Sequence, residues 1–191
     1  MTYHVLQFPY RAEYACVDET PENIDDAFEV GTGASCKALV RGTLRARFHG
    51  KHKGMKLDDF VDNPSRWILC SERARAVIAA ECDNVEVYPL ELLDHKRTPV
   101  GAPYFFVQVL GTVDCVDLEK SIYKRDRAWA HLFLSVYKLV LREEAIPSDL
   151  KLFRLKEKPE DIIIRSDLVA RLREAGATGF DLLDTGVPTL F

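Results

Sequence analysis

Two segments of the sequence share one pattern of apolar and polar residues, and this repeat constrains the fold more than any other feature. In the first, residues 66–92, a short apolar run leads to Ser71, then to apolar residues at helical spacing, and then to the alternating run VEVYPLEL. Residues 162–184 repeat this order when the sequence is shifted by 95 positions, with Ser166 in the place of Ser71. Both segments predict a strand, a serine, a short helix and a second strand.

The two serines stand where helix N-caps belong, and an N-cap of this kind contributes about 1 kcal/mol to stability. We expect Ser71 and Ser166 to cap their helices, and Gly176 to supply the left-handed residue that ends the second helix. Neither serine lies in a GxSxG motif, and neither has a histidine near it in the sequence. The pattern therefore does not indicate a nucleophile.

The rest of the chain supplies further strands and no low-complexity linker. Apolar or alternating runs predict strands at residues 3–8, 13–17, 38–48, 104–119, 134–142 and 151–155, the fourth of these ending in an acidic turn. The segment that precedes residue 134 has no clear period and is expected to be helical or irregular. We predict one α+β domain over residues 1–191, with a mixed or antiparallel sheet and two or three short helices.

Charge and cysteine content argue against several classes of protein. The net charge of −4 is opposite to the basic excess of a general nucleic-acid binder. The chain has no run near the roughly 20 apolar residues that a membrane span needs, and polar residues interrupt the N-terminal stretch where a signal peptide would lie. The five cysteines are odd in number and lie mostly among apolar residues. We expect a reduced, cytoplasmic protein with buried thiols and no membrane or nucleic-acid partner.

Two charge runs of opposite sign lie close together near the N-terminus. Residues 18–29, the acidic run, hold six carboxylates and no basic residue. The six are Asp18, Glu19, Glu22, Asp25, Asp26 and Glu29. From Lys37 to Lys56 there are seven Lys or Arg, two histidines and no acid, and residues 49–56 read as an exposed loop. We predict that the acidic run recognises a basic partner, with a solvated loop or helix surface as the alternative.

Other reactive residue types form no catalytic pattern. His49 and His52 have a spacing that metal ligands use, but no cysteine pair or acid lies near them in the sequence. The GTGASC stretch, residues 31–36, lacks the third glycine and the strand-to-helix context of a dinucleotide loop. Cys70 ends a predicted buried strand and is expected to be inert, and His131 lies among apolar residues. We therefore predict no enzyme activity, no metal and no cofactor.

Five segments, taken in order, resemble a known family. They are LDDFVDNPSRWILCSERARAVI, NVEVYPLELLD, YFFVQVLGTVDCVDLEKS, LKLFRL and IIIRSDLVARLREAGATGFDL, which together span about residues 57–183. Their order and spacing resemble immunity protein family 11 of bacterial polymorphic toxin systems. The resemblance implies a small cytosolic protein that binds and blocks a cognate toxin, often a nuclease, and it offers no catalytic residue to carry over.

The resemblance implies a mechanism of stoichiometric occlusion, in which an interface of about 1,600 Å² covers or distorts the toxin's active site. If the toxin attacks nucleic acid, its cleft is basic, and we expect the carboxylates of the acidic run to stand in for phosphates. Two alternatives remain. One is a small nucleotide- or phosphate-binding domain or enzyme that uses the basic segment between Lys37 and Lys56, and the other is a self-associating structural protein.

Overall fold

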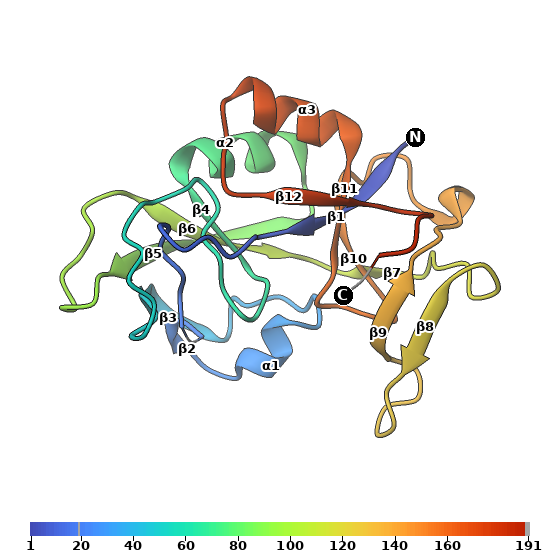
Figure 1. The fold of residues 1–191 in the computed structure, drawn as a ribbon, viewed down its shortest axis with the longest axis horizontal. Helices are drawn as coiled ribbons and strands as arrows, with labels where there is room; N and C mark the ends of the chain where they lie inside the picture. The colour runs from blue at the N-terminus through green and yellow to red at the C-terminus, as the bar shows by residue number, and fades with distance from the viewer. Residues whose placement is uncertain (19, 190–191) are drawn as a thin grey trace.

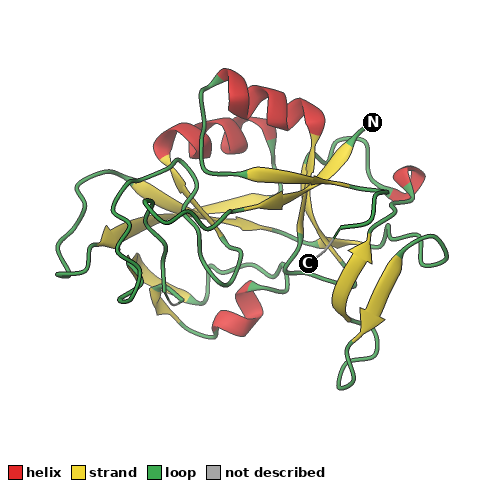
Figure 2. Ribbon diagram, in the orientation of Figure 1, coloured by secondary structure: helices red, strands yellow, loops and turns green. Residues whose placement is uncertain are grey.

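Three β-sheets and two regular α-helices make up the protein in a computed structural model that describes residues 1–18 and 20–189 (Figure 1, Figure 2). The first sheet has the strand order β12-β1-β11-β10-β7, and all its neighbours are antiparallel except β10 and β7. Its strands are β1 (Tyr3–Gln7), β7 (Thr112–Val113), β10 (Leu152–Leu155), β11 (Ile162–Arg165) and β12 (Asp181–Asp184). This sheet therefore brings the N-terminal strand between two strands from the C-terminal third of the chain.

The second sheet has the order β2-β3-β5-β6-β4, in which only β3 and β5 are parallel. Its strands are β2 (Glu22–Ile24), β3 (Val40–Arg47), β4 (Ile68–Ser71), β5 (Val85–Leu93) and β6 (Tyr104–Val109). The third sheet is a hairpin of β8 (Ile122–Arg125) and β9 (Phe133–Lys138), which projects from the body of the molecule in Figure 1. The helical segments are α1 (Ala27–Val30), α2 (Glu72–Glu81), the 3₁₀ turn η1 (Glu143–Ala145) and α3 (Ser166–Glu174).

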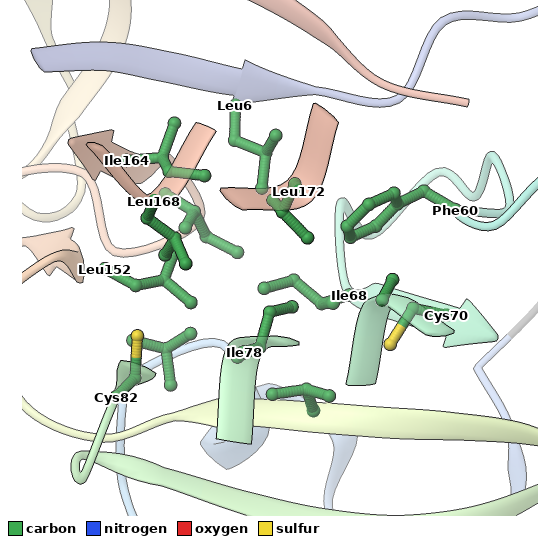
Figure 3. Packing of buried hydrophobic residues seen from close by; sticks show 14 of the residues in the cluster. Leu6, Phe60, Ile68, Cys70, Ile78, Cys82, Leu152, Ile164, Leu168 and Leu172 are labelled. Carbon is green, nitrogen blue, oxygen red and sulfur yellow. The ribbon is translucent and has the colours of Figure 1, made fainter. Parts of the chain in front are cut away.

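The two repeated units form as predicted and pack against each other. Helices α2 and α3 lie side by side above the sheets in Figure 1. Figure 3 shows that they share one apolar core, to which the first unit contributes Ile68 and Ile78. The second unit contributes Ile164, Leu168 and Leu172 to the same core. The predicted α+β fold, with mixed sheets, short helices and two similar units, is confirmed. Each unit has one apolar face, and each buries that face on the other.

The two serines differ in role, although the sequence predicts the same role for both. Ser71 is the N-cap of α2, and its Oγ accepts a hydrogen bond from the Ala74 N–H at 3.4 Å. Ser166 is instead the first residue of α3 and makes no capping bond, so the predicted second cap is wrong. Its hydroxyl instead donates to the carbonyl oxygen of Thr2, the residue directly before β1. The predicted helix end at Gly176 is confirmed, because this residue has φ 73° directly after the C-cap Ala175.

Several predicted strands have different bounds in the structure. Residues 13–17 form only isolated bridges to the loops beside them, and the strand predicted there is wrong. The run 104–119 breaks at Gly111, whose φ of 74° is incompatible with a continuous strand, so β6 and the short β7 replace it. The strand predicted at 134–142 ends at Lys138, and β8 lies within the segment for which no strand is predicted. None of the described helices has the length and apolarity that crossing a membrane requires.

Candidate interaction surfaces

The acidic run lies along the basic strand that follows it in the sequence. Strand β2 pairs antiparallel with β3, and this pairing places carboxylates beside arginines. Glu22 forms an ion pair with Arg47, and Asp25 Oδ2 lies 2.5 Å from Arg41 Nη2. Asp18 Oδ1 similarly lies 3.1 Å from a ring nitrogen of His49. Two of the predicted partner-binding carboxylates therefore already pair with an internal arginine, and a third lies beside a histidine.

The end of the acidic run carries the carboxylates that stay available. Asp26 and Glu29 are exposed, and neither has an ion-pair partner within the described part of the chain. Asp26 has φ 52°, and its Oδ1 accepts a hydrogen bond from the Glu29 N–H at 3.4 Å. Glu19, the sixth predicted residue, lies outside the described residues. Binding of a basic partner by this run stays a prediction, with Asp26 and Glu29 as its most accessible charges.

The basic segment is also largely neutralised. In addition to the arginines already described, Arg45 Nε lies 2.9 Å from Glu91 Oε2, and Lys56 forms an ion pair with Glu13. A recess of about 220 Å³ lies where β3 and β5 end. Its lining mixes the two signs of charge, with Asp18, Glu22, Arg45, Arg47, Asp94 and Arg97 among its residues. A site for phosphate would need a surplus of cations, and this recess does not have one.

The loop at 49–56 is less exposed than the sequence predicts. His52 is buried, with its Nδ1 3.0 Å from the Tyr10 hydroxyl and its Nε2 2.5 Å from the Tyr14 carbonyl oxygen. His49 has the acidic neighbour Asp18, which the sequence analysis does not anticipate. The two histidines therefore have separate partners. Within the described residues, no group of three or more His, Cys, Asp or Glu is arranged to hold a metal ion.

All five cysteines are free, and four of them are buried. Burial raises the pKa of Cys82 and of Cys115 to about 12, and that of Cys36 to about 11. Cys70 is fully buried at the end of β4, and burial raises its pKa as well. Because the thiolate is the reactive form, these side chains are inert packing residues, as predicted for Cys70.

A histidine 162 residues away in the sequence contacts Ser166. His4 Nε2 lies 3.1 Å from Ser166 Oγ, and His4 Nδ1 lies 2.8 Å from Asp184 Oδ1. This order of contacts resembles a Ser-His-Asp triad, but two features differ from one. The Ser166 hydroxyl donates its proton to the Thr2 carbonyl oxygen at 3.0 Å, and Asp184 is 70% exposed instead of buried. The trio therefore ties β1, α3 and β12 together.

Exposed apolar side chains concentrate on the β8–β9 hairpin. Among the described residues, six of the nine large hydrophobic side chains that are exposed lie on or beside this hairpin. They are Leu118, Ile122, Trp129, Leu134, Tyr137 and Val187. Among the side chains of the acidic run that the structure describes, no large apolar one is exposed. The sequence analysis missed this surface because it predicts no strand between residues 119 and 134, where β8 lies, and so leaves the hairpin unrecognised.

A concentration of exposed apolar side chains on one projecting element marks a candidate interaction surface. The comparison with known families specifies the class. The model of the immunity protein family Imm11 matches residues 10–187, and the chain belongs to this family. The match extends beyond the stretch at 57–183 that carries the resemblance and includes the acidic run. A comparison with curated proteins finds no match.

Proposed function

We propose that this immunity protein binds a cognate toxin and neutralises it by stoichiometric occlusion, without catalysis. The observation that carries the proposal is the family match, which spans nearly the whole chain. An interface of standard size takes about 800 Å² from each partner. That is a small part of the 9872 Å² of accessible surface that the protein offers. One face of the molecule is therefore enough to cover an active site.

The state of the reactive side chains supports binding over catalysis. The Ser166 hydroxyl is engaged by a backbone carbonyl, and the buried thiols have raised pKa values. The hydroxyl would have to lose this hydrogen bond, and the thiols would have to become exposed and deprotonated, before they could attack a substrate. A stoichiometric inhibitor needs no such release, because its polar residues serve the fold and its surface provides the contact.

A nuclease toxin would give the acidic run a role. The cleft of such a toxin is basic, and carboxylates that occupy it would mimic phosphates. Asp26 and Glu29 have no ion pair with a described residue to give up, whereas Glu22 and Asp25 would have to exchange an internal arginine for a toxin residue. Because these ion pairs are largely exposed, each is worth about 1 kcal/mol or less, and such an exchange is energetically possible.

The proposal is tested by co-expressing the chain with the toxin-like protein encoded next to its gene. We expect growth to be rescued, and the two purified proteins to form a complex with a fixed ratio of subunits in light scattering after gel filtration. Toxin activity should fall linearly as the chain is added and reach zero at that ratio. The proposal is wrong if the toxin stays active in the presence of excess chain, or if trace amounts of the chain inactivate it.

A further inference from the structure

We propose that the β8–β9 hairpin is the surface that meets the toxin, and that the toxin's matching face is apolar with an acidic rim. This inference rests on the proposed function. It assigns the contact to residues 118–138, which lie outside the acidic run. Three observations carry it: the position of two β-bulges, the internal bracing of the hairpin, and its unpaired positive charge.

Two bulges turn apolar side chains outward. Tyr123 pairs with Val136 and Ile122 with Lys138, so Tyr137 is an extra residue on β9. A second register shift lies nearer the start of β9, where Lys124 pairs with Ser135 and Arg125 with Phe133, so Leu134 is another extra residue. A regular strand would alternate and could not bury both Phe133 and Val136 on one face. The bulges allow both to be buried, while the two extra residues are exposed. Bulges that re-aim side chains are typical of functional sites.

The inner side of the hairpin is braced against the body of the protein. Phe133 and Val136 belong to a buried cluster that also includes residues of β1, β10 and β11. The rings of Tyr123 and Phe133 stack with their centroids 4.1 Å apart, and the Arg125 guanidinium lies 5.3 Å from the Tyr123 centroid. Asp126 Oδ1 accepts bonds from two backbone N–H groups of the turn. The outer residues are thus held in place before a partner arrives, which reduces the entropy cost of binding.

The hairpin carries an excess of positive charge. Lys124 and Arg127 are exposed, and neither forms an ion pair with a described residue. The only acid between residues 120 and 138 is Asp126, and its carboxylate is already engaged by the turn. The arginines of β3, in contrast, are paired with acids. A basic, apolar projection on a chain of net charge −4 is complementary to an apolar surface with acidic residues at its edge.

A protein fits this surface better than a nucleic acid does. Single-stranded nucleic acids are bound by aromatic platforms between basic residues, because each base needs a flat face to stack on. Four of the six exposed apolar side chains on or beside the hairpin are aliphatic and provide no such face, namely Leu118, Ile122, Leu134 and Val187. Apolar anchors together with tyrosine and arginine are the composition of protein interface hot spots.

The test measures the affinity of purified variants for the toxin-like protein encoded next to the gene, in a catalytically inactive form. Leu134→Asp places a charge among the outward apolar groups, and we expect it to weaken binding by about 30-fold or more, as for a hot-spot residue. Lys124→Glu combined with Arg127→Glu should slow association and reduce its salt dependence. Met55→Asp and Lys53→Glu are the matched controls, because both residues are exposed but lie in the loop at 49–56. We expect both controls to bind within about threefold of the unmodified chain.

The outcomes separate this inference from the proposed function. If the unmodified chain binds the toxin and the hairpin variants bind equally well, the hairpin assignment is wrong and the immunity function stands. If the unmodified chain does not bind at all, both proposals fail. Gel filtration of the chain alone and titration with a short RNA or DNA are included. A dimer, or a nucleic-acid complex, that Leu134→Asp or the charge reversal abolishes would assign the hairpin to that occupant and overturn the inference. Unchanged unfolding midpoints show that the variants are folded.

Discussion

Among single residues, Arg154 is a buried cation whose guanidinium depends on several hydrogen-bond acceptors. It is 1% exposed and has no carboxylate partner among the described residues, and burial lowers its pKa to about 10. Its guanidinium donates to the carbonyl oxygens of Val109 and Pro159, at 3.2 Å and 2.7 Å, and to Gln108 Oε1 at 3.3 Å. Gln108 Nε2 in turn donates to the carbonyl oxygens of Val30, the last residue of α1, and of Ala34 in the loop that follows. One buried network therefore joins β10, β6 and the glycine-rich loop at 31–36.

Replacing Arg154 by Met should destabilise the fold by about 2–4 kcal/mol, because buried acceptors lose their donor. The loss is measured as the change in the free energy of unfolding in urea. Lys156→Met is the control, since Lys156 is exposed and its ion pair with Asp114 is worth about 1 kcal/mol or less. A loss below 1 kcal/mol for Arg154→Met would show that the network contributes little to stability.

The thiols should resist alkylation in the folded protein. At pH 8 we expect no incorporation of iodoacetamide at Cys36, Cys70, Cys82 or Cys115 in native protein, and labelling of all five cysteines in denaturant, both measured by mass spectrometry. A free-cysteine peptide in the same tube verifies the reagent. Complete labelling of a buried cysteine without unfolding would contradict the expected inertness.

The same thiols predict how stability depends on alkaline pH. A thiol has a pKa of about 8.5 in the unfolded chain, and burial raises the pKa of Cys82 and Cys115 to about 12. Above about pH 8.5 the folded state therefore binds more protons than the unfolded state, and stability falls as pH rises towards 12. Urea midpoints at pH 8 and pH 10 measure this fall. Replacing Cys82 and Cys115 by Ala should make it shallower, and an unchanged slope would rule out these thiols as its cause.

At the scale of elements, the two strand–helix units act as one body because they share a core. Leu172 on α3 and Ile78 on α2 are both almost completely buried in that core. Glu81 adds a polar link from the end of α2, with Lys151 Nζ at 2.5 Å and Arg171 Nε at 3.4 Å. The link connects α2 to α3 and to the segment that leads into β10.

Leu172→Ala and Ile78→Ala should each cost about 2–5 kcal/mol in urea unfolding, as large-to-small changes in a packed core do. Because both side chains lie in one cluster, the double variant should depart from additivity by at least about 0.5 kcal/mol. Arg173→Ala, at an exposed position of α3, is the control and should change stability by about 0.5 kcal/mol or less. Strict additivity would mean that the two units behave as separate cores.

At the scale of the whole molecule, the acidic run and the hairpin are two surfaces of opposite charge. The run carries free carboxylates only at Asp26 and Glu29 within the described residues, whereas the hairpin carries free cations. A toxin with a basic cleft would bind the acidic run, and a toxin face with an acidic rim would bind the hairpin. Association kinetics distinguishes the two surfaces, because each is neutralised by a different substitution.

Asp25→Asn combined with Asp26→Asn should slow association with the toxin and flatten its salt dependence if the run steers the encounter. Asp26→Asn alone is the cleaner variant, because Asp25 also holds Arg41 and its loss releases that cation. Stopped-flow mixing at two ionic strengths measures the effect. Glu174→Gln serves as the single-charge control, because Glu174 is exposed on α3, which lies on the other side of the molecule from α1 (Figure 1). Unchanged rates and salt slopes would remove the run from the interface.

Features that depend on local pattern could be predicted from the amino-acid sequence. Apolar periodicity placed α2, α3 and the strands around them, and the left-handed requirement at Gly176 placed the end of a helix. Apolar neighbours of the cysteines indicated buried thiols, and the order of segments indicated the family. These features follow from which face of each element is apolar, and that information lies within a few residues.

Contacts between groups far apart in the sequence could be found only from the three-dimensional structure. The acidic run lies against β3 because β2 pairs with β3, and His4 meets Ser166 because β1 enters the sheet beside β11. The hairpin's outward side chains depend on two bulges that no local pattern announces. The physical reason is that strand pairing and register are fixed by burying several apolar faces at once, and partners for charged and polar groups follow from that pairing.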